Sequence, residues 1–275
     1  MLKTRVITAI LLAIGFLIAL FNTSGIAWSL ITLGAMLIGV WEWAKLIKLR
    51  KHATHIYLVI ALFIGLLIIY APSTASGHYV DEVVFGLLGL STLFWLIIAP
   101  IWLLTRKYFQ HKFWMAILGI VLLLATWVAL GGLHAISPWL LLTTLFTVWL
   151  ADSAAYFAGK QFGKHKLAPE ISPGKTWEGV MGALLAVTVF GLVLCYFQHI
   201  SRWLIVGLWL IVVLSIMGDL FESLLKRQAG VKDSSHLLPG HGGVLDRIDG
   251  LIPTLPLALF YIYFPLFANL QLHAR

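Results

Sequence analysis

The chain has 275 residues, of which 61% are hydrophobic and 11% are charged, and its mean hydropathy is +0.97. So little polar surface cannot cover a water-soluble globule of this length, which excludes a soluble protein and places the chain in a lipid bilayer. The net charge of +8 lies in short basic clusters between apolar runs, which argues against nucleic-acid binding. Cys195 is the single cysteine, so the sequence predicts neither an intrachain disulfide nor a thiolate metal cluster.

The sequence predicts an all-α, polytopic membrane protein with nine transmembrane helices. Its apolar runs are each about 16 to 22 residues long, enough to cross ~30 Å of hydrocarbon as helices. They lack the alternation of barrel strands, and a backbone in lipid must satisfy its own hydrogen bonds. Lys3 and Arg5 precede the first run as in a signal peptide, but no small-x-small cleavage site follows, so we expect an uncleaved span. In chain order the predicted spans are 6–21, 26–43, 56–71, 83–104, 113–130, 138–158, 180–199, 203–221 and 251–270.

The loop charges predict the orientation. If successive spans alternate, seventeen of the 19 Lys and Arg residues fall on one side, and only Arg202 and Arg275 fall on the other. The positive-inside rule then predicts a cytoplasmic N-terminus and an external C-terminus.

Polar chemistry is concentrated in the C-terminal half. Two long cytoplasmic loops are expected at 159–179 and 222–250, and eight of the 11 carboxylates lie between Asp152 and Asp249. We therefore expect one membrane domain over 1–275, in which 1–137 supplies scaffold and dimer spans and 138–275 forms the catalytic portion.

The eighth run ends in an acidic helix face. Asp219, Glu222, Ser223 and Lys226 follow the i, i+3, i+4, i+7 spacing. A surface ion pair is the ordinary interpretation. A carboxylate so near hydrocarbon needs a partner, however, which favours Asp219 as a cation ligand.

The following loop combines glycines with both charge signs. Gly242 and Gly243 let main-chain N–H groups approach an anion, and basic side chains would bind phosphates. Asp246 and Asp249 can face one point if a helix begins there, and such oxygen ligands recruit Mg²⁺. The alternatives are ordinary: His241 would only bond the turn and Lys232 would pair with Asp233. The basic candidates are Lys226, Arg227, Lys232 and Arg247.

A second cluster lies upstream. Asp152 sits at the edge of the sixth span, where basic residues of the next loop are its expected partners. Gly174-Lys175-Thr176 is not a Walker loop, because the first glycine is missing and no strand precedes it. Ser172, Lys175 and Thr176 remain either phosphate donors or, with Pro173, the start of a helix.

These stretches resemble the phosphatidate cytidylyltransferases, also called CDP-diacylglycerol synthases. The match covers Asp152 to Pro253. It includes Ser172-Pro-x-Lys-Thr-Trp-Glu-Gly179, Ser223-Leu-Leu-Lys-Arg, Lys232-Asp and Leu238-Pro-x-His241-Gly-Gly-x2-Asp246-Arg-x-Asp249.

The resemblance implies a reaction of CTP with phosphatidic acid, giving CDP-diacylglycerol and pyrophosphate with Mg²⁺ in the cytoplasmic leaflet of a bacterial inner membrane. It implies Asp219 and Asp246 as metal ligands, to which we add Asp249, and it suggests a homodimer; a second cation stays open. Asp219, Asp246, Lys226 and Arg247 are the expected catalytic residues. The expected substrate-binding residues are Asp152, Ser172, Lys175, Thr176, Ser223, Arg227, Lys232, Asp233, His241, Gly242 and Gly243.

Two other functions fit parts of the pattern. A CTP-dependent polyprenol or lipid kinase would transfer the γ-phosphate and release CDP. An ion-coupled transporter would use its intramembrane acids as an ion path, but it predicts acids at mid-depth in several spans, whereas these gather at one end.

Overall fold

The computed structural model describes residues 13–70, 77–107, 111–237 and 242–263. Within them, seven helical segments are long and apolar enough to cross a membrane. One of these is composite: α4 (Gly77–Leu93) continues through a π-helical turn, η1 (Phe94–Ile98), into α5 (Ala99–Thr105). The other six are α2 (Gly25–Leu46), α3 (Lys51–Tyr70), α6 (Lys112–Ile136), α7 (Pro138–Phe162), α8 (Trp177–Gln198) and α9 (Trp203–Ala229).

The helical class predicted from the sequence is confirmed. The first and last predicted spans correspond to shorter apolar helices, Ala13–Asn22 and α11 (Leu251–Tyr263), which adjoin residues outside the described ranges. The count of nine and the sides of the two termini therefore stay predictions. α9 continues past the predicted end at 221, so the loop before α11 is shorter than expected; the part of it that the structure describes contains the four-residue α10 (Leu245–Ile248).

A small antiparallel hairpin was not predicted. β1 (Lys166–Ala168) pairs with β2 (Ser172–Thr176) between α7 and α8. The Thr176 side chain accepts the Gly179 N–H and so caps α8. One of the two alternatives left open by the sequence was a helix start near Pro173, and it is wrong, because that proline lies in β2.

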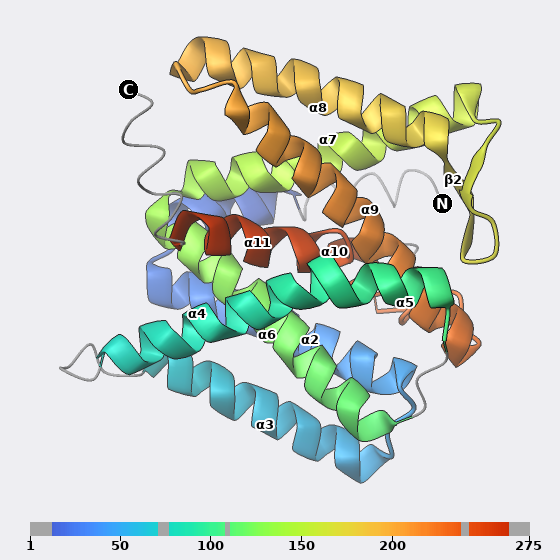
Figure 1. Cartoon of the computed structure of the whole chain (residues 1–275). Coiled ribbons are helices and arrows are strands. Elements are labelled where there is room, and N and C mark those ends of the chain that lie inside the picture. Colours follow the sequence, from blue (N-terminus) through green and yellow to red (C-terminus); the bar gives the residue numbers. More distant parts are fainter. Residues whose placement is uncertain (1–12, 71–76, 108–110, 238–241, 264–275) are drawn as a thin grey trace.

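α6 lies in the core, packed against α2, α4 and α11 (Figure 1). The buried Trp43 indole donates to the Met115 carbonyl at 2.8 Å, and Tyr57 donates to the Ala116 carbonyl at 2.9 Å. Gly119 lets α2 approach α6, because a Cβ there would overlap the Trp43 ring. Small residues at helix crossings are the usual means of close packing in membranes, where lipid supplies no hydrophobic drive.

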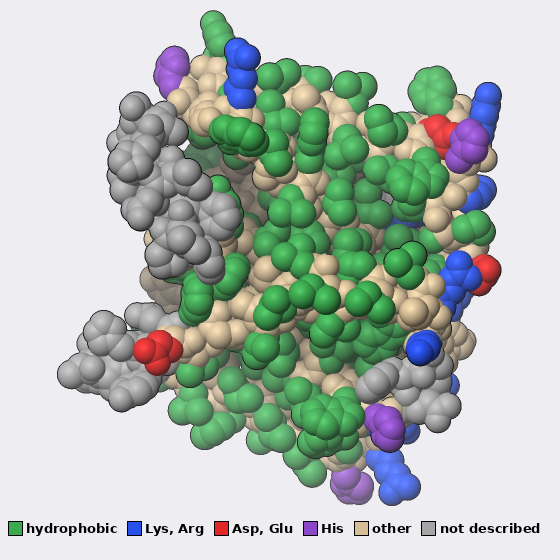
Figure 2. Space-filling model, viewed as in Figure 1, with side chains coloured by type: hydrophobic (Ala, Val, Ile, Leu, Met, Phe, Trp, Pro, Cys, Tyr) green, Lys and Arg blue, Asp and Glu red, His purple; other side chains and the backbone are tan. Residues whose placement is uncertain are grey.

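The outer surface is apolar over its middle and polar along one edge. In Figure 2 hydrophobic side chains cover the centre of the face, and Lys, Arg, Asp and Glu gather mainly along the right edge. Large apolar side chains such as Leu185 and Phe157 are about two-thirds exposed. An apolar exterior on long apolar helices identifies an integral membrane protein.

The α2–α6 crossing gives a first prediction. Gly119→Ala should lower the free energy of unfolding by about 1–3 kcal/mol, because the rigid Trp43 ring must move and lose its hydrogen bond to Met115. Thermal unfolding of the purified protein in detergent measures this. Gly34→Ala on α2 is the control, since a Cβ there meets nothing within 4 Å. Equal unfolding midpoints for the two variants would contradict the crossing.

Candidate active site

Three carboxylates converge where α7, α9 and the α10–α11 junction meet. A Cβ at Gly218 would overlap the Asp249 carbonyl oxygen, so the junction packs directly on α9 beside Asp219. Ser215 of α9 donates to Asp152 of α7 at 3.4 Å. Asp249 lies within electrostatic range of both Asp219 and Asp152.

The hairpin brings a lysine to this acidic group. Lys175 Nζ lies 2.6 Å from Asp219 Oδ2, and Ser223 donates to Asp219 Oδ1 at 3.2 Å. The hairpin is held at its base by Glu178, whose carboxylate lies 2.6 Å from His165 Nδ1. Its Ile171 packs into an apolar cluster on α9. Lys175 therefore reaches Asp219 from a separate, anchored element.

A second lysine joins α9 to the chain between α9 and α11. Lys226 Nζ lies 3.0 Å from Glu222 Oε2 and 2.6 Å from Asp246 Oδ1. Asp246 Oδ2 accepts three further bonds: from the Ser234 N–H at 3.0 Å, the Ser234 hydroxyl at 2.8 Å and the Gly243 N–H at 2.8 Å. Asp246 therefore closes a ring of contacts within the glycine-rich segment, by which we mean the described residues 230–237 and 242–250.

The pKa values of the Asp246 and Asp249 carboxyl groups are shifted in opposite directions. Burial opposes ionisation of Asp246, but the hydrogen bonds from Lys226, Gly243 and Ser234 outweigh it and hold its pKa below the usual range. Burial raises the pKa of Asp249, and the nearby Asp219 charge adds to this, bringing it to about 7 against the opposing effect of the Gly250 N–H. The surroundings of Asp249 thus disfavour the ionised form of its carboxyl group.

The remaining predicted residues differ in how far they are buried. Gly242 has a φ of +79°, and a Cβ there would lie 2.7 Å from Asp246 Oδ2, so the position requires glycine. Ser172 is half-buried in β2, and His241 lies outside the described residues. The exposed members are Arg227, Lys232, Asp233 and Arg247.

The sequence interpretation missed Glu42, Ser234 and Ser235. Glu42 of α2 is fully buried, and both serines donate to its carboxylate. The available signal was an acid inside an otherwise apolar span, which is costly unless partnered. Its partners lie about 200 residues further along the chain, beyond any local pattern.

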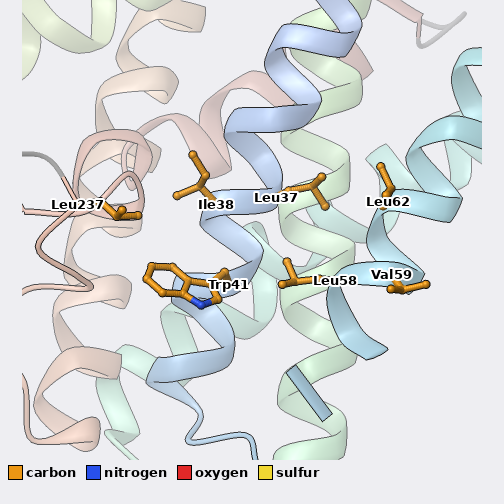
Figure 3. A pocket seen from close by; sticks show the side chains of 7 residues that line it. All are labelled: Leu37, Ile38, Trp41, Leu58, Val59, Leu62 and Leu237. Carbon is orange, nitrogen blue, oxygen red and sulfur yellow. The ribbon is translucent and has the colours of Figure 1, made fainter. Parts of the chain in front are cut away.

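Beside the glycine-rich segment lies a shallow apolar pocket of about 450 Å³ between α2 and α3 (Figure 3). Leu237 of that segment faces it, and Trp41, which precedes Glu42, forms part of its wall. The remaining lining residues are Leu37, Ile38, Leu58, Val59 and Leu62. An apolar surface therefore adjoins the polar site.

Carboxylate oxygens that could bind a metal ion are present, but several of them already pair with lysines. Within the described ranges, no three acidic, histidine or cysteine side chains form a ready-made metal cluster. Asp219 and Asp246 face lysines instead. Glu222 Oε1 is buried and has no hydrogen-bond partner among the described residues, and its carboxylate lies within electrostatic range of Asp249. An orphaned carboxylate oxygen beside other carboxylates suits a cation.

Fold and site together define an integral membrane protein with paired lysines and carboxylates at one end of its helices. Residues 3–265 match the cytidylyltransferase family, so the chain belongs to that family and is a nucleotidyltransferase. Two similar proteins are named phosphatidate cytidylyltransferase. The one from Haemophilus influenzae is 34% identical over 97% of this chain and 100% of its own length. The one from Pseudomonas aeruginosa is 36% identical over 93% of this chain and 95% of its own.

A third relative of the same name, from Staphylococcus aureus, is more similar over a shorter stretch. It is 47% identical over 129 residues, which are 46% of this chain and 48% of the relative.

The turn at Gly243 gives a second prediction. A Cβ at Gly243 would overlap both Ser234 Oγ and Glu42 Oε1. Gly243→Ala should therefore displace Asp246 and lower nucleotidyl transfer on the order of 10-fold or more. Steady-state rates of purified protein measure this against Gly207→Ala on α9, where a Cβ meets nothing within 4 Å. Full activity in the Gly243 variant would show that the close approach of Gly243 to Ser234 and Glu42 is not needed to position Asp246.

Proposed function

We propose that this chain transfers the cytidylyl group of CTP to phosphatidate, forming CDP-diacylglycerol and pyrophosphate. The observation that carries the proposal is the pairing of two lysines with two aspartates at one end of a membrane helix bundle: Lys175 with Asp219, and Lys226 with Asp246. Lysines poised in this way can rearrange to bind phosphates. The names of the full-length relatives support this choice of substrates.

The geometry suits a substrate that is part polar and part apolar. Phosphatidate keeps its acyl chains in the bilayer, whereas CTP arrives from water. Leu237 borders the apolar pocket, and Ser234 of the same segment bonds Asp246. One short segment thus adjoins both environments.

Bond making requires alignment more than acid–base chemistry. A phosphatidate oxygen attacks the α-phosphorus of CTP, a new P–O bond forms, and pyrophosphate leaves with the electron pair of the broken bond. The phosphate monoester is largely ionised near neutral pH, so no strong base is needed. Lys226, Arg227, Lys232 and Arg247 would neutralise the triphosphate, and Ser172, Lys175 and Thr176 would hold one phosphate.

Mg²⁺ fits the acidic residues of the site. We propose that Asp219 and Asp246 hold it, with Asp249 as a further ligand, while Glu222 contributes negative charge. A bound divalent ion would neutralise triphosphate charge. The negative charges of Asp219 and Asp152 oppose ionisation of Asp249, and a cation bound among the three would relieve this repulsion. The grouping therefore supports a cation at this place.

The same reasoning supports the orientation. Lys175, Lys226 and the basic α2–α3 connection belong to the side that the positive-inside rule assigns to the cytoplasm. We therefore propose an active site facing the cytoplasm in a bacterial inner membrane. Homodimerisation stays a prediction from the family resemblance.

The proposed reaction has a direct test. Purified protein in mixed micelles, given phosphatidate and CTP labelled at the α-phosphorus, should release pyrophosphate and place the label in lipid. EDTA should stop turnover, and Mg²⁺ should restore it. Formation of CDP with unlabelled lipid would favour a lipid kinase instead. The absence of both products would remove the enzymatic proposal.

Asp219 offers a site-specific test. Asp219→Asn keeps the side-chain volume and removes the charge, so kcat should fall on the order of 100-fold while the unfolding midpoint changes little. Glu170→Gln is the control: Glu170 pairs with Arg106 on the exposed hairpin turn, where an ion pair contributes little. A folded Asp219 variant with the rate of the unmodified protein would eliminate the proposed role.

A further inference from the structure

Glu42 is a fully buried carboxylate in the last turns of a membrane-spanning helix. The ion pairs among the described residues do not include it. A charge in such a place is costly unless hydrogen bonds satisfy it. Its presence in α2, within the half of the chain expected to serve as scaffold, therefore calls for a physical reason.

Four donors supply that reason, and all belong to the glycine-rich segment. Glu42 Oε1 accepts the Ser235 hydroxyl at 2.5 Å and the Val244 N–H at 3.0 Å. Glu42 Oε2 accepts the Leu245 N–H at 2.7 Å, and it lies 3.2 Å from the Ser234 hydroxyl, whose one proton it shares with Asp246 Oδ2 at 2.8 Å. The two N–H groups lie at the start of α10, where a helix leaves its first donors without acceptors.

One carboxylate thus joins two described stretches, 234–235 and 244–245. Ser234 and Ser235 precede the glycines, Val244 and Leu245 follow them, and all four meet at Glu42. Asp246 joins the same two stretches through Ser234 and Gly243. Ser234 Oγ lies within hydrogen-bonding distance of both carboxylates, so the position of Asp246 is tied to that of Glu42.

We propose that Glu42 is a positioning residue for cytidylyl transfer. It fixes the glycine-rich segment on α2 so that Asp246 and the Gly242–Gly243 turn keep the geometry that binds the CTP phosphates. The kinetic part of this inference rests on the proposed function. A merely stabilising role would lower the unfolding midpoint without changing the apparent affinity for CTP.

The experiment compares Glu42→Gln with the unmodified full-length protein in detergent. Glutamine keeps the shape but turns one acceptor oxygen into a donor, so one backbone N–H loses its acceptor and one serine hydroxyl must turn to accept instead of donate. Amide hydrogen exchange in peptides covering 242–248 should quicken about 10-fold or more, with peptides of α6 unchanged. The KM for CTP should rise or kcat fall about 10-fold, while the KM for phosphatidate stays within about two-fold.

Two further variants complete the design. Glu82→Gln makes the same chemical change at an exposed carboxylate of the α4–α5 span and should match the unmodified protein in exchange and kinetics. If Glu42→Gln does not fold, Ser235→Ala removes the 2.5 Å bond to Glu42, together with the acceptor of the Leu237 N–H, and should shift both readouts in the same direction, less strongly.

Unchanged exchange at 242–248 in a folded Glu42 or Ser235 variant would overturn the proposal, as would equal rises in both KM values. The exchange measurement needs no substrate. It therefore tests the clamp by Glu42 even if the unmodified protein fails to transfer cytidylyl groups, a result that would refute the proposed function alone.

Discussion

The site depends on buried carboxylates that hold the glycine-rich segment against the helices. Lys226 ties α9 to Asp246, and Asp246 in turn holds Ser234 and Gly243. These groups are largely removed from water: the side chains of Lys226 and Asp246 are 13% and 9% exposed. Breaking such a pair leaves an uncompensated buried charge, with a typical loss of about 3–5 kcal/mol, whereas the intact pair adds little net stability. Its effect is therefore mainly geometric.

The helix scaffold makes this geometry possible through close backbone approach. Gly218 admits the Asp249 carbonyl to the surface of α9, and Gly119 admits the Trp43 ring between α2 and α6. The first contact sets Asp249 beside Asp219. The second fixes α2 on α6, and with it Glu42, which lies one residue before Trp43. Packing in the apolar core and chemistry at the polar end are thus linked along single helices.

Sequence patterns predicted the helices well because each span must be apolar along its whole length. They placed the end of the eighth span at 221, where the apolar run stops, whereas α9 continues through the ion pair between Glu222 and Lys226 to Ala229. The hairpin escaped notice because its strands are too short to show alternation.

The residues of the site were identified from charge and glycine spacing, but their pairing could not be. Nothing local indicates that Lys175 meets Asp219 or that Lys226 meets Asp246. Glu42 was overlooked for the same reason, since a single acid in an apolar run gives no hint of a partner 192 residues away. Long-range contacts depend on how the helices cross, which hydropathy alone does not determine.

The central claim, that Lys226 and Asp246 act as a pair joining α9 to the glycine-rich segment, is tested most directly by a double-mutant cycle on stability. Lys226→Met, Asp246→Asn and the double variant would be compared with the unmodified protein by thermal unfolding in detergent. We predict that the double variant loses less stability than the two single losses combined, by about 1–3 kcal/mol. If the loss in the double variant equalled the sum of the two single losses, Lys226 and Asp246 would not act as a pair.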